Sequence, residues 1–292
     1  MHPVLLALSS APSAVVVEPP GDGPGHWAGA PSALLEDGTW WLAYRLRQPV
    51  DAGRGYANVL ARSADGVRFE VVASVTSDDL GAASLERPAL VRRPDGGWRL
   101  YVSCSTPDSK HWWVEALDAN GPEGLPQGRR TMVLPGSAAE AWKDVVVLPG
   151  PTWQMSACRH PLDAGDDEAD RMSTWSFTSA DGLDWHRQGE ALRPGTGWDR
   201  RGTRLTTVWH EGDQVLALYD GRASASENWH ERTGLAVGSG TALRAVDGPV
   251  PDTVGEALRY ACVVPEAAGL RVFFEQARAD GAHELRSLVV PR

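Results

Sequence analysis

The feature that most constrains this sequence is a unit that recurs five times along its 292 residues. Each copy has an apolar segment, a turn that contains Gly and a second apolar or aromatic segment, as in APSALLEDGTWWLAYRL from Ala30. The residues just before the copies lie 57, 57, 60 and 56 positions apart; they are Gly29, Glu86, Lys143, Thr203 and Arg259. A repeated strand–turn–strand unit of about this length is typical of a propeller blade. We therefore predict one all-β domain over residues 1–292, a five-bladed β-propeller with four-stranded antiparallel blades around a central funnel.

The outer half of a blade is also visible in the sequence. The segment NVLARSADGVRFEVVA alternates apolar and polar residues around Asp65-Gly66, and MSTWSFTSADGLDWHRQ does so around Asp181-Gly182. Asp-Gly between alternating segments is a strong hairpin signal. At the N-terminus we expect VLLALSS to form a strand that pairs with the last blade and closes the ring, because closure removes exposed edges.

Composition excludes several classes of protein and partner. The 13 Trp, 31 Gly and 21 Pro exceed what a helical protein uses, and a two-sheet sandwich would not explain the even period. A net charge of −10 argues against nucleic acid or an anionic membrane surface as partner. No apolar stretch has the length of a membrane span. The three cysteines are too few for a disulfide framework or a cysteine zinc site, so we expect reduced thiols, a cytoplasmic protein, and no metal or other cofactor.

The predicted topology brings two kinds of segment to the same face of the ring. Strand starts and the loops after second strands share that face, and several of them carry charged or aromatic side chains. Trp faces stack on sugar rings, and Arg binds carboxylate or phosphate oxygens in pairs. We predict a site there for a sugar-like, hydroxylated or anionic small molecule, with substrate-binding candidates Trp27, Arg45, Arg87, Lys143, Arg159, His160, Arg204, Asp220, Arg222, Trp229, Arg259 and Tyr260. The alternative is that these charges form ion pairs that join neighbouring blades.

At these strand starts the sequence resembles the five-bladed propeller glycoside hydrolases of families 43, 32 and 130, which include arabinanases, β-xylosidases, invertases and mannoside phosphorylases. The resemblance rests on the blade period, on SADGVRFE and SADGLDWHRQGEAL, and on the strand start WKDVVVLPG around Asp144. Hydrolytic members carry an Asp in the first blade, a tuning Asp and a Glu that acts as general acid. The resemblance implies that Asp144 is the tuning residue.

Two family positions hold other residues here. Ala30 stands where the resemblance implies the first-blade Asp, and the fourth blade begins Gly202-Thr203-Arg204 with no Glu. Glu86, at the second strand start, and Glu227, on the loop YDGRASASENWHERTG, are substitute candidates, so the predicted catalytic residues are Glu86, Asp144 and Glu227. The mannoside phosphorylases suggest a variant with one acid and several cations that hold phosphate.

Three functions therefore remain open from sequence. The first is a glycosidase-like enzyme, either hydrolase or phosphorylase, that uses these carboxylates. The second is a propeller without hydrolytic activity that binds carbohydrate or has been re-used in biosynthesis. The third is a scaffold for protein partners, which the charged loops disfavour.

Overall fold

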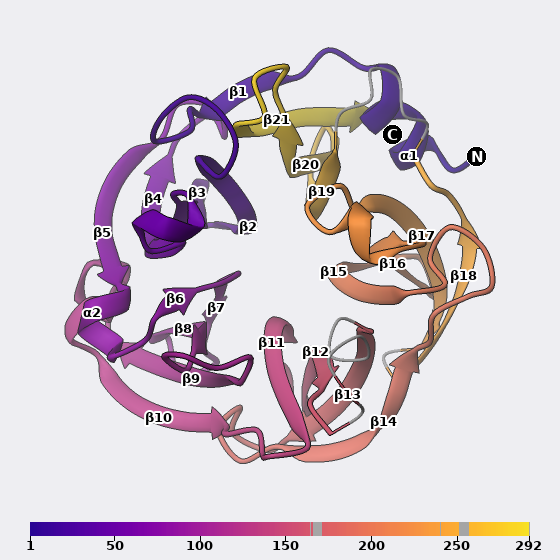
Figure 1. Cartoon of the computed structure of the whole chain (residues 1–292). Coiled ribbons are helices and arrows are strands. Elements are labelled where there is room, and N and C mark those ends of the chain that lie inside the picture. The colour runs from indigo at the N-terminus through magenta and orange to yellow at the C-terminus, as the bar shows by residue number, and fades with distance from the viewer. Residues whose placement is uncertain (164, 166–170, 240, 251–256, 292) are drawn as a thin grey trace.

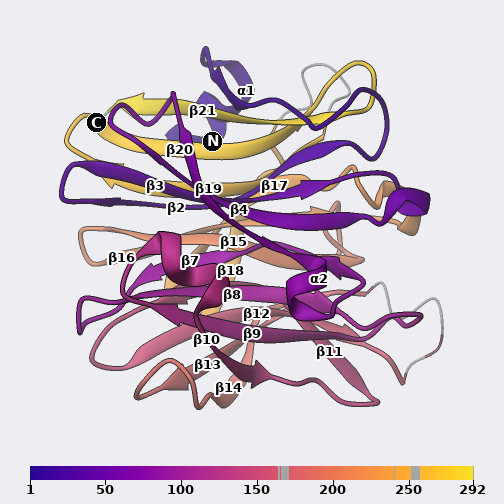
Figure 2. The ribbon, with the colours of Figure 1, turned by 90° about the vertical axis from the view of Figure 1, so that its left-hand side faces the viewer.

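The computed structural model describes residues 1–163, 165, 171–239, 241–250 and 257–291. In these residues the chain consists mostly of β-strands, which are arranged in antiparallel sets around a ring, as Figure 1 shows. Seen from the side, the strands run along the axis of the ring from one face to the other (Figure 2). The helical segments are short: α1 (Pro3–Ser10), η1 (Val50–Ala52), α2 (Ser77–Leu80), η2 (Pro122–Gln127) and η4 (Ala225–Glu227).

Each copy of the repeat forms the inner antiparallel hairpin of one set, and further strands extend that hairpin outward. The first set contains β2 (Trp27–Glu36), β3 (Thr39–Arg47), β4 (Gly55–Ser63) and β5 (Glu70–Thr76). The second contains β6 (Ser84–Leu85), β7 (Ala89–Arg92), β8 (Trp98–Ser105), β9 (Trp112–Ala119) and β10 (Arg129–Leu134). The third contains β11 (Glu140–Leu148), β12 (Trp153–Pro161), β13 (Ser173–Ser179) and β14 (His186–Leu192).

The remaining sets follow the same order. One contains β15 (Gly202–Glu211), β16 (Gln214–Arg222), β17 (Arg232–Ser239) and β18 (Ala242–Asp247). The other contains β19 (Leu258–Glu266), β20 (Gly269–Ala277) and β21 (His283–Pro291), and it is completed by β1 (Ala14–Val17) from the N-terminal segment. The two ends of the chain therefore meet in one set.

The prediction for VLLALSS is wrong, because this segment forms the helix α1. Pro3 occupies the first turn, where its missing N–H costs nothing, and the His2 ring accepts a hydrogen bond from the Val4 backbone. Val4, Leu5 and Leu8 are buried on one side of the helix. The strand that pairs with β21 is instead β1, with sequence AVVV.

The predicted outer hairpins are confirmed at both Asp-Gly turns. In the β4–β5 connection Asp65 Oδ1 accepts hydrogen bonds from the Val67 and Arg68 backbones at 2.9 Å, and Gly66 has φ of +72°. In the β13–β14 connection Asp181 accepts from two backbone N–H groups in the same way, and Gly182 also has φ of +72°. A glycine adopts this left-handed conformation without the steric penalty of a side chain.

The apolar core lies between neighbouring sets. One buried cluster packs Tyr101 of β8 against Val147 and Trp153 of the next set. Another packs Trp40 and Leu42 of the first set against Phe273 and Leu285 of the last. Because the first and last sets share a core, side-chain packing joins them around the ring. This leaves the strand starts, which carry the polar residues, at its centre.

Candidate functional site

The inner strands bend where they reach the centre of the ring. Figure 1 shows β2, β7, β11, β15 and β19 as the strands nearest that centre. The register of β2, β11 and β19 shifts next to Ala30, Asp144 and Tyr260, and these residues have φ of 51°, 53° and 53°. Bulges of this kind re-aim side chains and are common beside functional sites. Three copies of the repeat thus share one unusual backbone conformation at the same position.

Side chains from neighbouring sets hold these bends in place. The Tyr260 backbone donates to Asp220 at 3.0 Å, and the Ala30 backbone donates to Glu275 at 3.1 Å. The Asp144 backbone donates to the Ser103 hydroxyl at 2.9 Å. The polar groups at the centre therefore stabilise the backbone that positions them.

The centre is crowded with buried charge. Five carboxylates, all at most 8% exposed, lie there: Glu86, Asp144, Asp220, Glu231 and Glu275. Seven cations lie beside these carboxylates, and all of them except Lys143 are buried. The seven are Arg45, Arg47, Arg87, Lys143, Arg204, Arg222 and Arg259. Burial of an unpaired charge is costly, so these groups are expected to pair with one another.

Arg204 links three of the carboxylates. Its guanidinium lies 2.8 Å from Asp220, 3.6 Å from Asp144 and 3.7 Å from Glu231. It also lies over the Tyr260 ring, 3.8 Å from the ring centroid. Arg204 is the residue at the fourth strand start, where the resemblance implied a Glu. A cation therefore occupies that position and collects carboxylates around it.

A second group surrounds Arg259. Its guanidinium donates to Glu231 at 2.5 Å and to Glu275 at 2.7 Å. Glu275 also accepts a hydrogen bond from His283 at 2.7 Å, and His283 stacks on the Trp27 ring at 4.5 Å. Burial lowers the pKa of His283 even though Glu275 is beside it.

The pKa shifts follow the balance between burial and these cations. Burial opposes the charged form of Asp144, but Lys143, Arg204 and Arg45 outweigh it and lower the pKa of this carboxyl. Burial is likewise outweighed at Glu231 and at Glu275, above all by Arg259, so both pKa values fall well below the usual range. At Asp220 burial prevails and raises the pKa. The centre thus contains carboxyl groups with opposite tendencies, which is typical of acid–base sites.

Several of the predicted residues come together at this centre. Glu86 forms an ion pair with Arg45, and Asp144 lies 3.4 Å from the Tyr260 hydroxyl. Lys143 is 4.0 Å from Asp144 and lies over the Trp112 ring. Burial lowers the pKa of Lys143.

Other predicted residues lie at the edge or make structural contacts. Glu227 is on η4, where it accepts hydrogen bonds from the Ala223 backbone and the Ser224 hydroxyl, both at 3.0 Å. Arg159 pairs with Glu140 at 2.9 Å, and His160 contacts the Cys158 thiol at 3.7 Å. Arg87 donates to the backbone carbonyls of residues 31, 145 and 206, so its guanidinium joins three sets of strands.

Sequence reasoning missed Glu231, Glu275 and His283. Glu275 could have been found by aligning the second strands of three copies, AYRLR, LYDGR and FFEQA, which places Arg45, Asp220 and Glu275 at one position. Strand pairing supports this alignment, because Gly29 faces Arg45, Arg204 faces Asp220 and Arg259 faces Glu275. Glu231 lies only four residues beyond Glu227 and had no separate signal.

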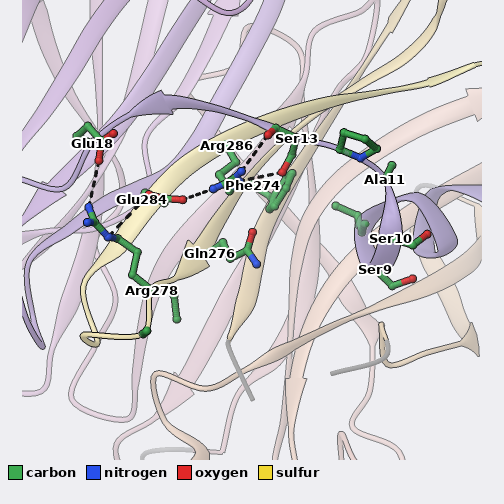
Figure 3. A pocket seen from close by; sticks show the side chains of 14 residues that line it. Ser9, Ser10, Ala11, Ser13, Glu18, Phe274, Gln276, Arg278, Glu284 and Arg286 are labelled. Atoms are coloured by element: carbon green, nitrogen blue, oxygen red, sulfur yellow. Dashed lines mark hydrogen bonds and ion pairs between the residues drawn. The ribbon is translucent and has the colours of Figure 1, made fainter. Parts of the chain in front are cut away.

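A groove of about 660 Å³ lies elsewhere, between the segment after α1 and the strands β20 and β21 (Figure 3). Its charged side chains pair with one another. Arg278 lies 3.1 Å from Glu18, and Arg286 forms an ion pair with Glu284 and donates to the Ser13 hydroxyl at 2.8 Å. Within the described part of the chain, no cluster of three potential metal ligands is found, and no helix has the length and apolar character needed to cross a bilayer.

No protein-family model matches this chain, and no curated protein matches its sequence. Solved structures do match over most of its length. A thermostable family-43 glycoside hydrolase gives a TM-score of 0.70 with 11% identity and covers 94% of this chain and 91% of its own.

Two further structures were solved with sugars. The β-1,2-mannobiose phosphorylase of Listeria innocua, in complex with β-1,2-mannobiose, gives a TM-score of 0.64 with 14% identity over 94% of this chain and 93% of that one. A family-43 enzyme of Xanthomonas citri, in complex with xylotriose, gives 0.65 with 14% identity over 98% and 92%. Identities this low show a common fold. The resemblance predicted from the strand starts is confirmed at that level: the chain has the β-propeller fold of these glycoside hydrolases and phosphorylases.

Proposed function

We propose that this chain is a five-bladed β-propeller enzyme that acts on a glycoside or a related polyhydroxylated small molecule, with its carboxylates at the central funnel. One observation carries the proposal. Glu86 and Asp144 lie at inner strand starts, among arginines and tryptophans, at the centre of a fold that glycoside hydrolases share. The repeat supports the number of blades, since each copy provides the inner hairpin of one antiparallel set.

The proposed roles follow from access and charge. Glu86 has a side chain 10% exposed, against 0–2% for the other central carboxylates, so we assign it to proton transfer. Glu227, with a side chain 32% exposed on the β16–β17 connection, is the proposed second acid–base group. Asp144 remains ionised beside Lys143 and Arg204 and tunes the site. Glu231 is held ionised between arginines, which suits it to orienting them rather than to proton transfer.

The remaining predicted contacts are proposed for substrate binding. Trp27 and Trp229 pack edge to face, with ring centroids 5.3 Å apart, and Trp229 is 37% exposed. Trp27 is 3% exposed, with His283 and Arg47 against its ring, so it supports Trp229, whose exposed ring is the one proposed to stack on a sugar. Arg45, Arg204 and Arg259 are proposed to orient hydroxyl or anionic groups of the substrate.

Substitution of the two proposed acid–base groups tests the assignment. Purified protein is assayed on a panel of aryl glycosides, with and without inorganic phosphate, and the products are separated as free sugar or sugar phosphate. Because general acid–base catalysis contributes about 10²- to 10⁴-fold, Glu86→Gln and Glu227→Gln are each expected to lower kcat by that amount with the folded state intact. Glu123→Gln, at an exposed position on η2, is the matched control. Full activity in both test variants would refute the assignment.

A second function is favoured by Ala30. Its backbone has nearly the conformation of Asp144, yet it carries no carboxylate at the first strand start, and Arg204 fills the fourth. These replacements favour a propeller that binds carbohydrate, or an enzyme re-used in biosynthesis, without hydrolysis. Turnover of a glycoside by the wild type supports the glycosidase. If the wild type shows no turnover, Ala30→Asp is the discriminating variant, since an aspartate tolerates this backbone. Hydrolysis gained by the variant then identifies a hydrolase that has lost its first-blade acid, and sugar binding without turnover supports a re-used protein.

A further inference from the structure

Arg47 and Arg54 differ from the other arginines at the centre. The guanidinium of Arg87 also has no carboxylate within 4.0 Å among the described residues, but it donates to three backbone carbonyls. Arg45, Arg204 and Arg259 each lie within 4.0 Å of at least one carboxylate oxygen. For Arg47 and Arg54, which flank the β3–β4 connection, the described residues supply no carboxylate within that distance. Among the described residues, the side chain of Arg47 makes one hydrogen bond, to the Gly25 carbonyl at 3.3 Å. The Nε of Arg54 is buried without a hydrogen-bond partner among the described residues.

Burial makes this lack of anions costly. Arg47 is 4% exposed, and burial together with Arg45, Arg259 and Arg54 lowers its pKa to about 9. Burial and Arg45 also lower the pKa of Arg54. A buried guanidinium surrounded by other guanidiniums is stabilised when an anion binds between them.

Tryptophan rings hold both guanidiniums in place. Arg47 lies 4.0 Å from the ring centroid of Trp27 and 5.0 Å from that of Trp229. Arg54 lies 5.9 Å from the ring of Trp112, which also contacts Lys143 at 4.8 Å. Stacking on a ring face leaves the N–H edges of a guanidinium free to donate in the plane, the geometry in which arginine binds two oxygens at once.

The backbone at this place is strained. Arg54 has φ of +64° and Trp229 has φ of +82°, a region that residues with side chains adopt at a cost. Such strain is concentrated at ligand-binding sites. In Figure 1 the β3–β4 and β16–β17 connections, which carry these residues, both lie on the side of the ring that faces the viewer.

We propose that Arg47 and Arg54 form an oxyanion subsite, walled by Trp27, Trp112 and Trp229, that binds a carboxylate, phosphate or sulfate group next to the sugar. This rests on the proposed function and narrows its substrate class to acidic sugars or to sugars bound together with an inorganic oxyanion. The chemistry is common to both sources, because each presents two oxygens to the N–H edge of a guanidinium.

Matched ligand pairs test the subsite. Isothermal titration calorimetry compares glucose with glucuronate, galactose with galacturonate and mannose with mannuronate, and adds inorganic phosphate alone and with each neutral sugar. For the wild type, at least one uronate, or one neutral sugar in the presence of phosphate, is expected to bind about tenfold or more tightly than the neutral sugar alone, since one charge-assisted contact contributes on this scale. Tighter binding of a uronate identifies an acidic sugar as the ligand. Tighter binding of a neutral sugar in the presence of phosphate identifies a free oxyanion bound beside the sugar.

Variants connect that preference to the two arginines. Arg54→Gln and Arg47→Gln are expected to lose the about tenfold preference while the affinity for the neutral sugar stays within about twofold. The matched control is Arg62→Gln on β4, the strand that follows Arg54. The side chain of Arg62 is 48% exposed and pairs with Glu70. Circular dichroism and thermal unfolding identify any variant that fails to fold. If Arg54→Gln fails to fold, Arg54→Lys is used in its place. Lysine keeps the positive charge but lacks the paired N–H donors of the guanidinium, so this variant is expected to retain part of the preference for the anionic ligand.

The outcomes separate this inference from the proposed function. Neutral sugars that bind as tightly as the acidic ones, with no effect of phosphate, would overturn the subsite and leave a sugar-binding protein. A preference that survives both Gln substitutions would also overturn it. Phosphate that binds in an Arg54-dependent way, with no sugar bound at all, would support the subsite and overturn the sugar-directed function.

Discussion

The centre of the ring and the groove beside α1 are both lined by arginines and carboxylates, but they pair these groups differently. In the groove, Arg278 and Arg286 are 37% and 24% exposed in their side chains, and each has a carboxylate partner. At the centre, the guanidiniums are nearly all buried, and those of Arg47, Arg54 and Arg87 have no carboxylate within 4.0 Å in the described structure. The groove is thus a surface where local charges cancel, whereas the centre retains donors for a ligand.

This difference shows that a groove in the surface of this molecule is not by itself evidence of a functional site. Ion pairs at an exposed groove contribute little, since water and side-chain entropy compete with them. Buried pairs couple strongly to one another and to the backbone, so their loss propagates. The predictions below compare the two regions under the same measurement, the free energy of unfolding in urea.

Glu275→Gln is expected to have the largest effect. Glu275 accepts hydrogen bonds from Arg259, His283 and the Ala30 backbone, and it is fully buried. Removing its charge leaves Arg259 partly uncompensated, so we expect the free energy of unfolding to fall by about 3–5 kcal/mol. A loss below about 1 kcal/mol would mean that the centre tolerates changes of charge as the groove does.

The second-largest effect is expected from acid, which should lower the free energy of unfolding that the central carboxylates contribute. The pKa values of Glu231 and Glu275 in the folded protein lie below their ordinary value of 4.5. Their stabilisation is therefore fully present above pH 4.5 and is lost as the pH falls, because the unfolded chain takes up protons first. Between pH 7 and pH 3.5 the difference in stability between the wild type and Glu275→Gln should shrink by about 1.4 kcal/mol. A difference that grows on acidification would contradict the direction of the shift.

Glu18→Gln in the groove should change least. Glu18 is 69% exposed in its side chain and pairs with Arg278, itself 37% exposed. A pair in this setting is worth about 0–1 kcal/mol, so the variant should unfold within that margin of the wild type and keep the same affinity for ligands at the centre. A larger loss would show that the groove holds the N-terminal segment in place more firmly than its exposure indicates.

The repeat made the fold predictable because each copy carries the same local signals. Asp65-Gly66 and Asp181-Gly182 predicted hairpins that the structure confirms, since both turns use an aspartate that accepts two backbone N–H groups. The N-terminal segment was mispredicted because a short apolar run fits a strand or a buried helix face equally well. Pro3 and the capping by His2 decide for the helix, and tertiary contacts of Leu5 with the core stabilise it.

The candidate site was predictable to the extent that it follows the repeat. Glu86, Lys143, Arg204 and Tyr260 lie at strand starts, whose spacing is visible in the sequence. Glu231 belongs to a loop and reaches Arg259 only through the folded path of β17, which no local pattern encodes. The pairing of each arginine could not be predicted either, because ion pairs across the ring join residues that are distant in the sequence.

The pairing of β1 with β21 also bears on how this protein is made. Ala14 faces Ser287, so β1 cannot complete its pairing until β21, far later in the sequence, has been synthesised. Until then the edge of β20 is unpaired, Glu275 lacks its partner His283, and the cluster of Trp40 and Phe273 lacks Leu285. Such long-range closure is slow and leaves strand edges exposed to other chains. A nascent chain stalled before residue 283 should therefore lack both the final strand pairing and His283 at the centre, which makes completion of the ring and completion of the site a single late event.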